Sequence, residues 1–130
     1  MAETESRKVK RVHLENPIKV VICSIGGGIK YDMTTRDISS TGFFLEYDSP
    51  ARFPFNRSSI LEVWMTVDRD NALFFNGKMA RVVYPDPSHQ ENSHSSPGIG
   101  IKIVQINEEN MAKLDSFLKD TLLKLKNISA

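Results

Sequence analysis

The sequence predicts an all-β domain that ends in a C-terminal helix. Six short apolar runs, rich in Val, Ile and Phe and divided by turn residues, have the length and spacing of strands in a β-sandwich or barrel. After them the apolar residues recur at three- and four-residue steps, as on one face of an amphipathic helix. A length of 130 residues fits a single domain. The six runs are residues 18–25, 29–38, 43–47, 60–67, 73–84 and 99–106.

Each predicted element has a local signal. The three glycines at 26–28 indicate a tight hairpin between the first two strands, because glycine tolerates positive φ. Apolar side chains occupy every second position of 60–67, which predicts a strand with one buried face. Residues 85–97 are polar and rich in turn formers, so we expect a surface loop. The helix is expected at 107–127, with Asn107 as its N-cap and acidic residues in the first turn.

Composition limits the classes of partner. Seventeen basic and sixteen acidic residues give a formal net charge of +1, whereas a polyanion-binding domain usually has a larger excess. Binding to a nucleic-acid polymer is therefore not expected, and any anion site must be local. The one cysteine, Cys23, excludes an internal disulfide and suits a reducing compartment. No apolar run approaches the roughly 20 residues of a membrane span, and the N-terminus lacks the apolar region of a secretory signal, so we expect a cytoplasmic protein without membrane insertion.

Basic residues are concentrated near the N-terminus. Arg7, Lys8, Lys10 and Arg11 place four cations within five residues of a chain that is otherwise nearly neutral. Residues 1–13 have no apolar periodicity, so we expect a flexible arm. On spacing alone this arm could equally be a solvated basic tail.

A second polar segment lies between two predicted strands, where a simple hairpin needs only two residues. It reads Asp37-Ile38-Ser39-Ser40-Thr41-Gly42. Asp and Ser here could be turn formers, because their side chains bond to nearby backbone groups.

Taken together, the two segments match the pattern RxxxR followed by [D/N]xSxxG, ahead of several more strands. The chain thereby resembles the PilZ domain family, bacterial receptors for cyclic di-GMP, over almost its whole length. The resemblance implies a six-stranded antiparallel PilZ-type β-barrel at 17–106, and residues 98–103 are similar to the family's last strand. It also implies a cyclic di-GMP site formed by Arg7, Arg11, Asp37, Ser39 and Gly42, with Lys8, Lys10, Ser40 and Gly100 as secondary contacts.

The chemistry of these residue types suits a cyclic guanine dinucleotide. An arginine fork can donate to guanine N7 and O6 together, which lysine cannot do with the same geometry. The Asp37 carboxylate can accept from the N1–H and N2–H₂ donors on the other edge, and the Ser39 hydroxyl can bind a phosphate oxygen. Ser6 and Thr41 stand where many family members have Arg and Gly, which leaves open whether one ligand or an intercalated pair binds.

The family resemblance further implies that binding draws the arm onto the barrel and that the domain then signals to a protein effector. The alternative is a PilZ-like adaptor that makes a constitutive protein contact without nucleotide. The C-terminal helix could cover the barrel or pair with another copy, so oligomerisation stays open.

Other chemistry has little support. No segment resembles a nucleophile elbow or a metal-hydrolase helix, and nothing in the sequence places a base beside Ser39, so we expect no enzyme activity. His89 and His94 share the polar loop with Asp86 and Glu91, but nothing predicts the rigid arrangement that a metal needs. No metal or other cofactor is expected.

Two further interpretations concern single residue types. His13, just after the basic arm, is expected at the surface or at the rim of the site. The aromatic residues could form a stacking platform for nucleic acid, but most lie in apolar runs and are expected in the core. They are Phe43, Phe44, Phe53, Phe55, Trp64, Phe74 and Phe75.

Overall fold

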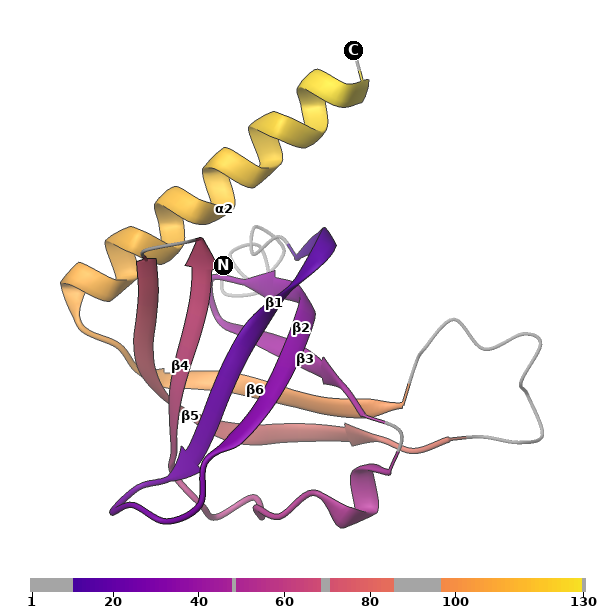
Figure 1. Cartoon of the computed structure of the whole chain (residues 1–130), viewed down its shortest axis with the longest axis vertical. Helices are drawn as coiled ribbons and strands as arrows, with labels where there is room; N and C mark the ends of the chain where they lie inside the picture. The colour runs from indigo at the N-terminus through magenta and orange to yellow at the C-terminus, as the bar shows by residue number, and fades with distance from the viewer. Residues whose placement is uncertain (1–10, 48, 69–70, 86–96, 130) are drawn as a thin grey trace, which may run out of the picture.

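The computed structural model describes residues 11–47, 49–68, 71–85 and 97–129, with side chains as far as Lys124. Six antiparallel strands close into a barrel in the order β1-β2-β3-β6-β5-β4, and a long helix follows (Figure 1). The predicted six-stranded barrel with a C-terminal helix is confirmed. The elements are β1 (Val12–Ser24), β2 (Tyr31–Ser39), β3 (Gly42–Glu46), the 3₁₀ helix η1 (Pro50–Arg52), β4 (Leu61–Asp68), β5 (Asn71–Val83), β6 (Gly98–Gln105) and α2 (Glu108–Ser129).

The first strand begins earlier than the sequence pattern indicated. Val12 and Leu14 are buried and alternate with exposed His13 and Glu15, so residues 12 and 13 are strand and not part of an arm. The register with β2 shifts between His13 and Ile18. Pro17 lies in that interval and has no backbone N–H to donate to a ladder, which is why the apolar run seemed to begin only after it.

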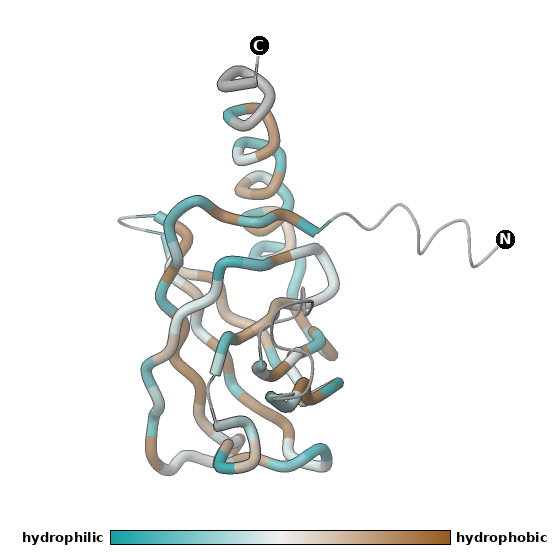
Figure 2. Tube along the Cα trace, turned by 90° about the vertical axis from the view of Figure 1, so that its right-hand side faces the viewer, coloured by the Kyte–Doolittle hydropathy of each residue, from teal (hydrophilic) through white to brown (hydrophobic). Residues whose placement is uncertain are grey.

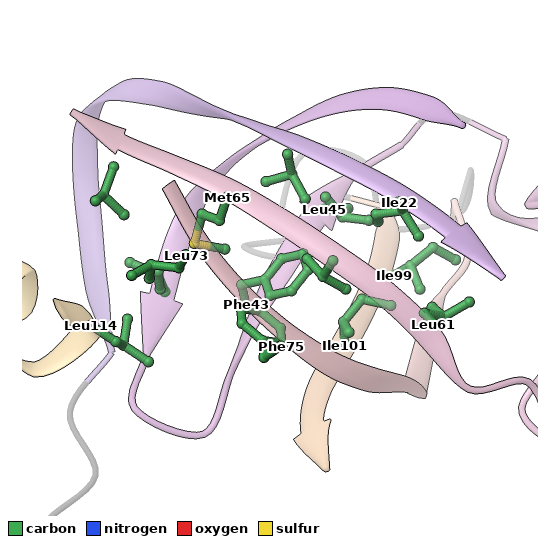
Figure 3. Close-up of a cluster of buried hydrophobic side chains, with 14 of the residues drawn as sticks. Ile22, Phe43, Leu45, Leu61, Met65, Leu73, Phe75, Ile99, Ile101 and Leu114 are labelled. Carbon is green, nitrogen blue, oxygen red and sulfur yellow. The ribbon is translucent and has the colours of Figure 1, made fainter. Parts of the chain in front are cut away.

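The barrel interior is filled by aliphatic and aromatic side chains from all six strands (Figure 3). Phe43 and Phe75 meet edge to face at its centre, with ring centroids 5.8 Å apart. Leu61, Val63 and Met65 of β4 have no exposed surface, which confirms the predicted apolar face of this strand. In Figure 2 hydrophilic and hydrophobic segments alternate along the strands, as expected where one face is buried.

The hairpin between β1 and β2 is built as its glycines predicted. Gly26, Gly27 and Gly28 all have positive φ, between 94° and 118°. Cys23, just before this turn, is buried as expected and its thiol donates to a Glu62 carboxylate oxygen at 3.4 Å. Burial and the neighbouring Glu62 raise the pKa of the Cys23 thiol, so the thiol form is favoured.

The C-terminal helix is attached to the barrel by its first half. Asn107 caps it, because its side-chain oxygen accepts the backbone N–H of Asn110 at 2.8 Å. The Asn110 side chain in turn accepts the N–H of Phe74 on β5, and Leu114 and Leu118 are buried against the core. Figure 1 shows the C-terminal half of α2 extending past the barrel. No helix in the described ranges combines the length and apolar character that a membrane span requires.

Leu114→Ala should lower the free energy of unfolding by about 2–5 kcal/mol, because it leaves a cavity where a fully buried side chain joins helix and barrel. Leu123, on the same helix, is 58% exposed, so Leu123→Ala should change stability by less than about 0.5 kcal/mol. Urea unfolding followed by circular dichroism measures both. Equal losses would contradict this account of how α2 is attached.

Candidate ligand-binding site

One row of residues crosses five neighbouring strands and brings together positions far apart in the sequence. His13 on β1 pairs with Asp37 on β2, and Asp37 pairs with Phe44 on β3. Phe44 pairs with Gly100 on β6, and Gly100 pairs with Arg81 on β5. Since directly paired residues have Cβ atoms about 5 Å apart, the row forms one continuous strip. We call it the cross-strand row.

Asp37 and Arg81, two charged residues of this row, each follow a break in register. The pairing of β2 with β3 shifts between Thr35 and Asp37, and that of β5 with β6 shifts between Met79 and Arg81. An extra residue in one strand re-aims the side chains beside it. Two bulges therefore set the directions in which the Asp37 and Arg81 side chains of the cross-strand row point.

Thr35 holds the first bulge from inside the barrel. Its side chain is 2% exposed, and its hydroxyl oxygen accepts the N–H of Asp37 at 3.3 Å. The same hydroxyl lies 2.5 Å from the carbonyl oxygen of Phe44 and 3.1 Å from that of Asp37. A buried hydroxyl with these partners ties the backbone of Asp37 to that of Phe44.

Arg81 lies across the row. Its guanidinium carbon is 5.6 Å from the centroid of the Phe44 ring, within the range of a cation–π contact. A Cβ added to Gly100 would approach the Arg81 Cγ to 3.1 Å. The glycine thus leaves the space through which Arg81 reaches Phe44.

A second set of pairs runs beside the first. Ser39 pairs with Gly42, and Gly42 pairs with Lys102. The Ser39 side chain is 8% exposed, and its oxygen accepts the Thr41 N–H at 3.2 Å. A Cβ on Gly42 would collide with the carbonyl oxygen of Ile101 on β6, so close packing of β3 on β6 requires glycine here.

Most residues of these two sets of pairs, though not His13, line one depression on the barrel, of about 170 Å³, which we call the cross-strand pocket. Three cations line it, Arg11, Arg81 and Lys102, against one carboxylate, Asp37. The chain as a whole is nearly neutral, so this is a local concentration of positive charge. The remaining lining residues are Ser39, Thr41, Gly42, Phe43, Phe44, Ala80, Gly100 and Ile101.

The structure places five of the nine residues predicted for the site around the cross-strand pocket, namely Arg11, Asp37, Ser39, Gly42 and Gly100. Ser40 instead lines a separate depression between the β2–β3 turn and the start of α2. Arg7, Lys8 and Lys10 lie outside the described residues.

Seven of the twelve lining residues were not predicted for the site, and three of these, Phe44, Arg81 and Lys102, have side chains suited to ligand contacts. Phe44 was expected in the core but is half-buried and forms part of the pocket wall. Arg81 and Lys102 come from β5 and β6, whose pairing with each other and with β3 no local pattern reveals. The alternation of β3, with Phe43 buried beside Phe44, is the one signal that could have indicated an outward aromatic ring.

Among the described residues, no group of three or more His, Cys, Asp or Glu side chains is arranged to hold a metal ion. The polar loop with His89 and His94 lies outside the described residues, as do Asp86 and Glu91. The polar side chains of the cross-strand pocket carry guanidinium, ammonium and hydroxyl groups and a single carboxylate. This set suits an anionic ligand more than a metal cation.

Comparison with known proteins agrees with this geometry. The family model of the PilZ domain matches residues 5–120, and the chain belongs to the PilZ domain family. No curated protein matches the chain by sequence.

Solved structures of similar fold include three with low sequence identity. MrkH of K. pneumonia in complex with cyclic di-GMP superposes with a TM-score of 0.70 at 17% identity, over 92% of this chain and 53% of that one. The Bacillus subtilis inhibitor of motility, MotI/DgrA, gives 0.64 at 12% identity over 93% and 52%. The PilZ domain of Escherichia coli YcgR with cyclic di-GMP gives 0.65 at 11% identity over 95% and 96%. The chain spans about half the length of the first two.

Gly42→Ala should lower the free energy of unfolding by about 1–3 kcal/mol, because the new methyl group meets backbone that cannot move without separating β3 from β6. Gly100→Ala is the matched control, since its methyl group meets only the flexible Arg81 side chain and should cost less than about 0.5 kcal/mol. Urea titration of both variants provides the measurement. A Gly42→Ala variant as stable as the parent would remove the packing role of this glycine.

Proposed function

We propose that this chain is a receptor module for cyclic di-GMP and that the cross-strand pocket binds part of the ligand. The observation that carries the proposal is the convergence of Arg11, Asp37, Ser39 and Gly42 from two distant segments on one cation-rich depression. MrkH and the YcgR PilZ domain, which share the fold, were solved with this ligand. Membership of the PilZ family supports the same ligand class.

Each pocket residue has a role that its chemistry allows. The Asp37 carboxylate accepts from the adjacent N1–H and N2–H₂ donors of one guanine. Arg11, together with Arg7, donates to guanine N7 and O6 or to the phosphates. Ser39 lines the pocket, where its hydroxyl can bond to a phosphate oxygen, and Lys102 adds positive charge nearby.

Arg81 and Phe44 extend the proposal beyond the motif residues. The planar guanidinium of Arg81, already lying over the Phe44 ring, offers a flat surface on which a guanine base can stack. Arg81 lies three strands from Asp37 along the cross-strand row, and its side chain reaches back to Phe44, which is directly paired with Asp37. A base held by Asp37 at its edge and by Arg81 on its face is fixed in both directions.

The pocket does not enclose a whole dinucleotide. Its volume of about 170 Å³ is below the roughly 300–1,000 Å³ of typical small-molecule sites. We therefore infer that the segment carrying Arg7, Lys8 and Lys10 completes the site and changes conformation when the ligand binds. We expect the domain to signal through a protein partner that recognises the changed conformation.

Loss of the motif arginines tests the site. An Arg7→Ala, Arg11→Ala double variant should bind cyclic di-GMP about 10²- to 10⁴-fold more weakly, because it loses several charge-assisted hydrogen bonds. Isothermal titration calorimetry measures the dissociation constant, with GTP and the linear dinucleotide as competing ligands.

Arg52→Ala is the control for the loss of positive charge, since Arg52 is an exposed arginine in η1, outside the cross-strand pocket. It should bind like the parent chain. Normal binding by the double variant would refute the site assignment. No heat from the parent chain at tens of micromolar protein would favour the nucleotide-independent adaptor.

Arg81→Ala should weaken cyclic di-GMP binding by about 5- to 100-fold through loss of a stacked face. Arg81→Lys keeps the charge but not the plane and should recover only part of the affinity. If Arg81→Lys binds as tightly as the parent chain, Arg81 contributes charge alone and the stacking role is wrong.

A further inference from the structure

We propose that His13 is a positioning residue for Asp37 in the ligand site. The inference rests on the proposed function, because it concerns how the cyclic di-GMP site is held ready. His13 belongs to neither sequence motif. It is the first member of the cross-strand row, directly opposite Asp37.

The contact between the two side chains is short and specific. His13 Nδ1 lies 2.8 Å from Asp37 Oδ1, and the side chains are 67% and 25% exposed. The ladder pairing of the two residues fixes their separation, so the imidazole is placed by the strand and not by a mobile loop. Asp37 itself follows the bulge that Thr35 holds. The backbone of the carboxylate is thus fixed by Thr35, and its side-chain rotation is fixed by His13.

The contact is compatible with ligand binding. A carboxylate has two oxygens and about four lone-pair directions, of which His13 uses one on Oδ1. The other oxygen and the remaining lone pair can accept the two adjacent donors of guanine. His13 therefore need not leave when the base arrives, and it prevents the carboxylate from rotating away.

The contact between His13 and Asp37 contributes little to folding stability. Ion pairs exposed to solvent add little to the free energy of unfolding, and His13 is mostly exposed. The orientation of one acceptor group in a binding site, by contrast, acts directly on affinity, because a pre-organised group loses less freedom on binding.

The experiment compares cyclic di-GMP affinity in three proteins by calorimetry. His13→Asn places an amide nitrogen near the position of Nδ1 and keeps a hydrogen bond to Asp37, so it should bind like the parent chain. His13→Leu should bind about 3- to 10-fold more weakly than the parent chain, because the carboxylate is released.

Two controls separate this role from a general effect. A His89→Leu, His94→Leu variant should bind like the parent chain, because those histidines belong to neither the motifs nor the cross-strand row. In an Asp37→Asn background, His13→Leu should cause no further loss of affinity, since His13 acts through the carboxylate. Circular dichroism confirms that each variant is folded.

The outcomes are distinguishable. Binding by His13→Leu as tight as by the parent chain, or full additivity of His13→Leu with Asp37→Asn, overturns the positioning role while leaving the proposed function intact. A parent chain that binds no cyclic di-GMP overturns both. Loss of affinity in His13→Leu with retained affinity in His13→Asn supports the inference.

Discussion

The register between β3 and β6 is the constraint on which the candidate site depends. These strands are distant in sequence, and their pairing sets Phe44 against Gly100 and Gly42 against Lys102. Each of those pairs joins one part of the pocket to another. Because side chains alternate along a strand, a slip of one residue would turn Phe44 inward and Phe43 outward, and it would destroy the pocket and the core together. Burial of Phe43 against Phe75 therefore fixes the same register that the ligand site needs.

Two glycines allow the register between β3 and β6 to form the pocket, for different reasons. Gly42 has no room for a side chain because the backbone of β6 lies against it, so it serves the packing of the barrel. The space beside Gly100 is occupied by the Arg81 side chain, which extends to the Phe44 ring. A glycine in a binding motif need not touch the ligand. Here one glycine brings two strands together and the other gives a charged side chain its path.

The sequence predicted most of the fold because burial produces periodicity. Five of the six apolar runs begin within three residues of the strand that forms there, and the helix begins one residue after its predicted cap. The start of β1 was missed because Pro17 and its polar neighbours interrupt the apolar pattern, although Val12 and Leu14 are buried. The motif segments were identified through a family resemblance. The contribution of Arg81 and Phe44 to the pocket could not be predicted, because their contact depends on the order of non-consecutive strands and on a bulge.

The charge distribution argues for a compact ligand and against an extended one. A nucleic-acid polymer is bound by cations spread along a track of phosphates, and a chain with a net charge of +1 offers no large general attraction. The cross-strand pocket instead gathers Arg11, Arg81 and Lys102 around one carboxylate within a single depression. A carboxylate repels phosphate, so Asp37 among these cations favours a ligand that has hydrogen-bond donors as well as negative charge. A guanine base joined to phosphates has both, and a simple anion has only the charge. In the proposed function, Asp37 therefore selects a nucleotide over a simple anion, and its orientation matters as much as the cations around it.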